Sequence, residues 1–237
     1  MKALILSDIH ANIDALRTVA EKESDADMIC CAGDLVDYGV YPKEVLSFVR
    51  EHQIRCVQGN NDRRVVAMAR ENRYPDLTKP HWFADFNLHC LSDDDLAFLA
   101  ELPVGLFFEA DGVEYYLSHS FRGGYDEIAF PVQFREFWNE NCPASDPLKK
   151  HRCIFGHTHR SGYLAVSDTE LWLNPGSVSY NHGDGSAAAA HYAVIENGSI
   201  SLRTLDYPRK QMADRIRSLN LNETDAPVGR LFFCGDE

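Results

Sequence analysis

The segment "FGHTHRSG", residues 155–162, places two histidines one residue apart, directly after an apolar run. A single histidine beside an apolar run is most often a packing residue. His157 and His159 are different, because side chains at i and i+2 of an extended backbone point to the same side. Gly156 before them leaves room for a ligand to approach. The pair therefore predicts a metal site whose other ligands come from elsewhere in the chain.

Further candidate ligands stand where other apolar runs stop. Asp8 and His10 follow the first run, and Asp34, Asn60 and His119 follow three later ones. Because the carboxyl ends of strands in an open α/β sheet form one rim, we expect these side chains to converge with the two histidines. Carboxylate, imidazole and amide ligands suit Mn²⁺, Fe²⁺ or Zn²⁺, and the lack of thiolate disfavours a structural zinc. The number of ligands suits two adjacent divalent ions, which can clamp a phosphoryl group and acidify a bridging water.

The elements that position these residues alternate between strands and helices. This alternation predicts βαβ units with parallel strand pairs. We expect one domain over residues 1–237, with a helical insertion around 63–103. The expected strands are 2–7, 28–32, 55–58, 104–109, 114–118, 153–155, 163–166, 170–173, 192–196 and 200–206. The expected helices outside the insertion are 13–23, 42–50, 132–141 and 211–219.

The composition is that of an ordinary globular protein, with 45% hydrophobic and 25% charged residues. A formal net charge of −13 argues against binding to a nucleic-acid backbone. Seven scattered cysteines without a Cys-x-x-Cys pair predict free thiols in a reducing compartment. No apolar run approaches the roughly 20 residues of a membrane span. We therefore expect a cytoplasmic protein without a membrane partner, whose oligomeric state stays open.

The ordered motifs resemble those of the calcineurin-like metallophosphoesterases, in particular the small bacterial phosphodiesterase and diadenosine-tetraphosphatase-like branch. They are "SDIHAN", "GDLVDYGVYPKEV", "QGNND", "SHS", "FGHTHRSG" and "NPGSV". The resemblance implies an α/β fold built as a four-layer α/β/β/α sandwich with mixed sheets. It implies two divalent metal ions, with Asp34 bridging. The first ion would be held by Asp8, His10, Asp34 and His159, and the second by Asp34, Asn60, His119 and His157.

The same resemblance implies a metal-dependent phosphoesterase that hydrolyses phosphate esters or anhydrides of a small phosphorylated substrate. A metal-bridging hydroxide would attack phosphorus in line, and His119 and His157 would stabilise charge as metal-bound imidazoles. Asn61 and Asp62 are further catalytic candidates. Asn61 stands where the family commonly has its leaving-group acid, and it cannot donate a proton in that sense. The site then either lacks a leaving-group acid, or another donor, such as a metal-bound water or His182, supplies the proton.

Asn12, Asn60 and Arg63 are the candidate substrate contacts. Helix capping is the alternative role for Asn12, and an ordinary solvated charge is the alternative for Arg63. A catalytically silent scaffold of the same fold, binding partner proteins through its surface, is the alternative function. The substrate stays open among monoesters, diesters, cyclic nucleotides and dinucleoside polyphosphates, and so does the identity of the metals.

Overall fold

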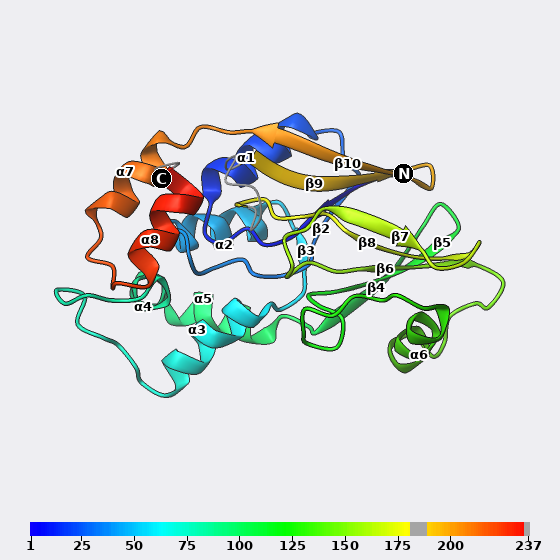
Figure 1. The fold of residues 1–237 in the computed structure, drawn as a ribbon, viewed down its shortest axis with the longest axis horizontal. Coiled ribbons are helices and arrows are strands. Elements are labelled where there is room, and N and C mark those ends of the chain that lie inside the picture. The colour runs from blue at the N-terminus through cyan, green and yellow to red at the C-terminus, as the bar shows by residue number, and fades with distance from the viewer. Residues whose placement is uncertain (181–188, 235–237) are drawn as a thin grey trace.

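The structure is a computed structural model that describes residues 1–180 and 189–234. Two five-stranded sheets form its centre (Figure 1). The first sheet has the order β10-β9-β1-β2-β3, and the second has the order β4-β5-β6-β8-β7. The strands of the first sheet are β1 (Lys2–Leu6), β2 (Met28–Cys31), β3 (Arg55–Cys56), β9 (Ala189–Glu196) and β10 (Ser199–Asp206). Those of the second are β4 (Gly105–Ala110), β5 (Val113–Ser118), β6 (Lys150–Ile154), β7 (Gly162–Ala165) and β8 (Glu170–Asn174).

Both sheets are mixed. In the first, β1-β2 and β2-β3 pair in parallel, while β9 runs antiparallel to β1 and β10. In the second, β5-β6 and β6-β8 are parallel, and the edge strands β4 and β7 pair antiparallel. The predicted parallel pairs are thus confirmed, and β4 and β5 form an antiparallel hairpin.

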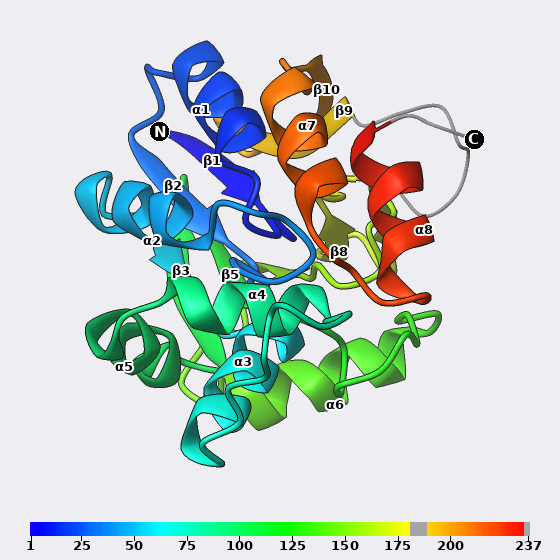
Figure 2. The same ribbon diagram turned by 90° about the vertical axis from the view of Figure 1, so that its left-hand side faces the viewer.

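Alternation along the strands places one set of apolar side chains between the sheets and another set outside them. The inner set includes Ile5 and Cys30 of the first sheet and Tyr115 and Ile154 of the second. On the outer face of the first sheet pack α1 (Ile13–Lys22) and α2 (Pro42–Glu51), and on that of the second packs α6 (Pro131–Asn141). Figure 2 shows α1 and α2 on one side and α6 at the opposite end. The predicted four-layer sandwich is confirmed.

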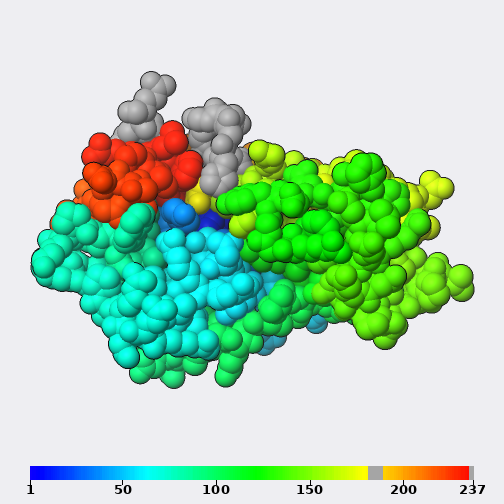
Figure 3. Space-filling view, turned by 60° about the horizontal axis from the view of Figure 1, so that its bottom comes forward, coloured from blue at the N-terminus to red at the C-terminus, as the bar shows by residue number. Residues whose placement is uncertain are grey.

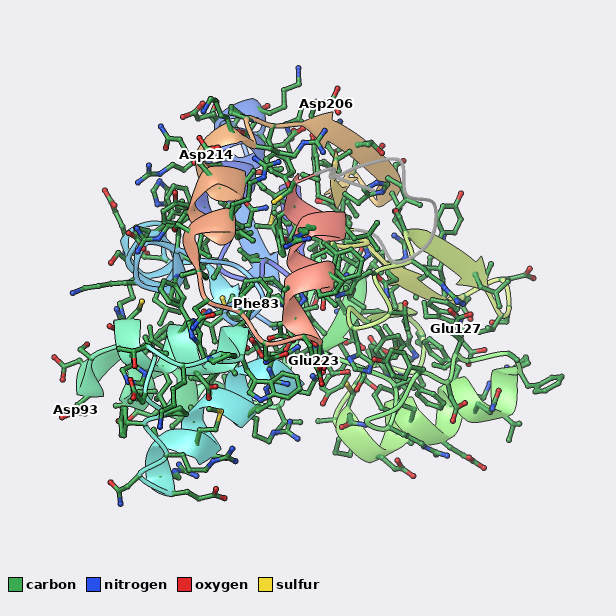
Figure 4. All side chains as sticks on the ribbon, turned by 60° about the vertical axis from the view of Figure 1, so that its left-hand side comes forward. Phe83, Asp93, Glu127, Asp206, Asp214 and Glu223 are labelled. Atoms are coloured by element: carbon green, nitrogen blue, oxygen red, sulfur yellow. The ribbon has the colours of Figure 1, made fainter. Side chains whose placement is uncertain are left out.

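The remaining helices gather at one end of the molecule, on the left in Figure 1. They are α3 (Asn60–Arg70), α4 (Phe83–Cys90), α5 (Asp93–Glu101), α7 (Lys210–Ser218), α8 (Asp225–Gly229) and a π-helical turn, Arg230–Cys234. Phe83 of α4, labelled in Figure 4, is fully buried and its ring packs edge-on against Phe233. This contact ties the C-terminal π-helical turn to the middle of the chain. The sequence pattern missed this turn and α8, whereas α7 was expected as the helix 211–219.

A buried ion-pair network fastens the first sheet to the end of α1. Glu23, whose side chain is 1% exposed, accepts hydrogen bonds from Tyr192 and Arg203 at 2.9 and 2.6 Å. Lys2 Nζ lies 2.9 Å from the second oxygen of the same carboxylate. One carboxylate therefore links α1 with β1, β9 and β10. All seven cysteines are free, as predicted.

Candidate metal centre

Two groups of histidine and aspartate side chains meet where strands of both sheets end. Asp8, His10 and His159 form the first group, and Asp34, His119 and His157 form the second. Within each group the potential ligand atoms lie within 4.8 Å of one another. The sequence expected one rim of one sheet, and this was wrong. The segments that follow β1 and β2 of the first sheet and β5 and β6 of the second supply the candidate ligands.

The nitrogen atoms approach each other closely in both groups. His10 Nε2 lies 3.2 Å from His159 Nε2, which is also 3.2 Å from Asp8 Oδ1. In the second group, His157 Nδ1 lies 3.2 Å from His119 Nε2. Ring nitrogens facing one another at this distance present two lone pairs to one point unless a proton lies between them. A metal ion at that point satisfies both lone pairs.

Asp34 lies between the two groups. Its Oδ2 is 3.4 Å from His119 Nε2 and 4.0 Å from His10 Nε2. This is the position that a bridging carboxylate would take. The first and second groups therefore adjoin, which is the arrangement that a pair of ions needs.

Backbone carbonyls fix the orientation of two of the imidazoles. The Nδ1–H of His119 donates to the carbonyl oxygen of Ala32 at 2.7 Å, and that of His159 donates to Tyr180 at 2.9 Å. With the proton held at Nδ1, each Nε2 keeps its lone pair directed into the centre. Outer hydrogen bonds of this kind are typical of metal-ligating histidines.

The loops that carry the ligands have left-handed backbone. His157 and His159 have φ values of +66° and +57°, so the extended backbone expected for them was wrong. Their side chains turn into different groups as a result. Asp8, His10 and Asp34 also have positive φ, between +48° and +56°. Non-glycine residues adopt this conformation at a cost, and such residues cluster at functional sites.

The two carboxylates of the centre are buried and need positive charge. Asp8 and Asp34 are 0% and 1% exposed, and among the described residues only histidines lie in ion-pair range of them. Burial opposes the ionised form, but neighbouring imidazoles outweigh it and lower the pKa of both carboxyls. Likewise burial lowers the pKa of His119, but Asp34 outweighs it and raises that pKa to about 10, so its Nε2 favours a cation, which is either a proton or a metal ion in the proton's place. The donor set thus fits cations.

Two further observations support a fit to metal. Asp8 Oδ1 is buried and accepts no hydrogen bond from any described residue. His10 Nδ1 is also buried and forms no hydrogen bond with any described residue. Burial lowers the pKa of His10 to about 4, against the attraction of Asp34, so this imidazole is neutral at pH 7. A neutral imidazole and an unsatisfied carboxylate oxygen are suitable ligands for a divalent ion.

The residues of the "GNND" motif take three different positions at the start of α3. Asn60 Oδ1 lies 2.8 Å from His119 Nε2, which adds the predicted amide to the second group. Asn61 donates to both oxygens of Asp34, from its backbone N at 2.9 Å and from Nδ2 at 2.6 Å. Asp62 is fully buried, and its two oxygens accept four backbone N–H groups, of Gly59 and residues 34–36. These hydrogen bonds position the loop of Asp34, and the catalytic role of Asp62 stays a prediction.

The structure shows Asn12 in its alternative role as a helix cap. Its Oδ1 caps α1 by accepting from Ala15 N at 3.1 Å. Its Nδ2 donates to Ser179 and Tyr207, and the residue is 0% exposed. Capping and packing occupy the whole side chain. His182, one of the predicted proton donors, lies outside the described residues.

Several residues at the centre carried no sequence signal. Tyr180 supplies the carbonyl that holds His159, and its ring lies 5.2 Å from that of His10. Tyr125 is 72% exposed and stacks on His157 with ring centroids 4.3 Å apart. Tyr38 packs edge-on against His10 at 5.4 Å, and only its place in the "GDLVDYG" motif could have indicated it.

Comparison with known proteins places the chain in a family. The model of the calcineurin-like phosphoesterase superfamily domain matches residues 1–197. The chain therefore belongs to this superfamily, as its motifs predicted. The family covers the strands and loops that carry both groups of candidate ligands.

Individual relatives agree with this. An uncharacterized protein of Methanocaldococcus jannaschii is 26% identical over 98% of this chain and 97% of its own length. A metallophosphoesterase from Sphaerobacter thermophilus is 25% identical, with a TM-score of 0.72, over 98% of this chain and 99% of that one. YfcE, a phosphoesterase from E. coli, shares the fold at 22% identity and a TM-score of 0.51, over 87% and 100% of the two chains. A candidate diadenosine tetraphosphatase shares the fold at 17% identity and a TM-score of 0.56, over 86% and 94% of the two chains.

None of the helices in the described ranges has the length and apolar composition that crossing a bilayer requires.

Proposed function

We propose that the protein is a dinuclear metal-dependent phosphoesterase that hydrolyses esters or anhydrides of a small phosphorylated substrate. The position of Asp34 between two adjoining His/Asp groups carries this proposal. The first ion would be held by Asp8, His10, Asp34 and His159. The second would be held by Asp34, Asn60, His119 and His157.

When bound, two divalent ions supply an acidified bridging water for in-line attack on phosphorus and positive charge for the phosphoryl oxygens. The protein's own residues prepare this chemistry. Hydrogen bonds to Ala32 and Tyr180 orient His119 and His159, and Asp62 braces the loop of Asp34. His119 and His157 lie on the side of the centre nearest to the exposed Tyr125. In Figure 3 the N-terminal segment, in blue, reaches the surface in a small hollow between cyan, green and red regions.

The donor chemistry of oxygen and nitrogen ligands without thiolate favours Mn²⁺, Fe²⁺ or Zn²⁺. The test is elemental analysis of the purified protein combined with hydrolysis of p-nitrophenyl phosphate in the presence of Mn²⁺. We expect two ions per chain and metal-dependent turnover that a chelator abolishes. Two bound ions without turnover on any phosphate ester or anhydride would instead favour the silent scaffold.

A further inference from the structure

A cavity of about 290 Å³ adjoins the second metal group. Asn60 and His119 form part of its wall, so it is continuous with the proposed metal centre. The cavity lies where α3 meets the segment from β5 to α6, the cyan and green regions that touch in Figure 3. A group bonded to a phosphate over the second ion would therefore extend into this space.

The charge of the cavity wall is opposite to that of the protein. Arg63 and Arg122 line the cavity, and none of its described lining side chains is acidic. The chain as a whole carries 36 acidic residues and a net charge of −13. Figure 4 shows acids such as Asp93, Asp206 and Asp214 at the periphery of the molecule. A cationic cavity in such a chain favours an anionic ligand.

Most polar groups of the wall are already satisfied. Tyr116 donates to Asn141 at 2.8 Å, and Asn141 donates to the carbonyl of Phe137 at 2.7 Å. Ser118 donates to the carbonyl of Ser120 at 3.3 Å. These groups shape the wall and leave recognition to the arginines.

The two arginines differ in how far their charge is compensated. Arg122 lies 3.4 Å from Glu136 and 3.6 Å from Glu140, both on the exposed face of α6. Arg63 makes one long contact, from Nε to Gln58 Oε1 at 3.4 Å, and no described residue accepts from its terminal nitrogens. Gln58 is itself anchored by donating to Leu99 at 2.8 Å. Arg63 is thus oriented and has two terminal donors to offer.

The helix geometry directs Arg63 toward the metal centre. Arg63 follows Asn60 by three residues on α3, so the two side chains share one face of the helix. The next residue, Arg64, turns to another face and pairs with the buried carboxylate of Asp37 at 2.5 Å. Only the first of these two arginines therefore has its charge available to a ligand of the second metal group.

We infer that Arg63 is the main element of a subsite for a second anionic group of the substrate. The substrate would be a phosphate ester or anhydride whose leaving group carries its own carboxylate or phosphate. This inference rests on the proposed function only in placing the first phosphate over the metal groups. Two terminal nitrogens of one guanidinium bind a carboxylate or phosphate in bidentate fashion.

The test measures binding of non-hydrolysable phosphonates to the Mn²⁺-loaded protein by titration calorimetry. Propylphosphonate is compared with 3-phosphonopropionate, with longer ω-phosphonocarboxylates, and with 1,3-propylenediphosphonate. At the best spacer we expect the second anion to improve affinity about tenfold or more, as charge-assisted hydrogen bonds do. The carboxylate and diphosphonate arms distinguish which kind of anion the subsite prefers.

Arg63→Ala should remove this gain, and Arg63→Lys should retain part of it. Arg70→Ala is the matched control, because Arg70 is exposed on the same helix two turns further on and does not line the cavity; it should keep the full gain. No gain at any spacer in the wild type, or an equal gain in Arg63→Ala, would overturn the inference. Because turnover is not measured, an Arg63-dependent gain in a protein without hydrolytic activity would refute the proposed function alone.

Discussion

Replacing Asp34 by asparagine tests the assignment of one carboxylate to two ions. In the structure Asp34 Oδ1 accepts from Asn61 N, and Oδ2 accepts from Asn61 Nδ2. An amide has a single oxygen, so in Asp34→Asn its NH₂ group must face one of these two donors. The substitution therefore removes a charge and a hydrogen bond together, with almost no change in size.

The expected loss of affinity follows from the charge. Asp34 Oδ2 lies 3.4 and 4.0 Å from the nearest nitrogens of the two groups, so an ion in either group would be a close neighbour. A unit charge pair at about 4 Å contributes about 4 kcal/mol at an effective dielectric constant of about 20, and a divalent ion contributes at least this much. That energy corresponds to a loss of at least roughly 10³-fold in affinity for each ion. Both ions should weaken, because both groups adjoin the same carboxylate.

The assay is metal content after dialysis against buffered free Mn²⁺, followed by turnover of p-nitrophenyl phosphate. Asp37→Asn is the matched control, because Asp37 is equally buried three residues further on and pairs with Arg64 outside the two groups. We expect two ions in the wild type and in Asp37→Asn, and fewer than one in Asp34→Asn. Two ions with normal turnover in Asp34→Asn would refute the bridging assignment.

Three further substitutions test the framework and the site. Burial raises the pKa of the Glu23 carboxyl, but its hydrogen-bond donors outweigh burial and lower this pKa below the ordinary value of 4.5. The stability that the ionised Glu23 provides is therefore present above pH 4.5, and it is lost as the pH falls through the lowered pKa of the folded state. Glu23→Gln should cost about 3 kcal/mol in urea unfolding at pH 7 and less at pH 3, while exposed Glu21→Gln should stay within about 0.5 kcal/mol. Gly59→Ala would place a Cβ 2.0 Å from Asp34 Oδ1 and 2.3 Å from its backbone N, and should cost about 2–3 kcal/mol, measured by thermal melting. Asn61→His should raise turnover of alkyl phosphates about 10²-fold and leave p-nitrophenyl phosphate nearly unchanged, and equal dependence of log kcat/KM on leaving-group pKa in both proteins would contradict this.

The sequence predicted the strands and the ends at which candidate ligands stand, because both depend on local patterns. Apolar runs of strand length end in Asp8, Asp34 and His119, and the βαβ alternation brings parallel strand ends together. It could not predict that two sheets contribute. Nothing in the local pattern of β5 or β6 indicates which sheet each strand joins, since this depends on long-range pairing.

Contacts made by backbone atoms were also beyond the sequence. The carbonyls of Ala32 and Tyr180 orient two imidazoles, yet every residue has a carbonyl, so no side-chain pattern marks them. The sequence also could not show that Arg64 pairs with an acid while Arg63 pairs with none of the described acids. Successive residues on a helix lie about 100° apart, and only the packed structure shows which of them meets an acid.

The least predictable feature is the backbone that holds the ligands. Five of the seven predicted ligands have positive φ, and in every case the residue is not glycine. Each costs of order 1 kcal/mol or more relative to ordinary backbone, so local preference opposes the conformation that the site requires. Hydrogen bonds between the loops compensate for this, among them Asp8 N to Gly33 O at 2.9 Å and His10 N to Asp34 O at 3.0 Å. Because these bonds join the loops after β1 and β2 directly, the ligands are held in place by the protein itself, and an incoming ion needs little rearrangement of them.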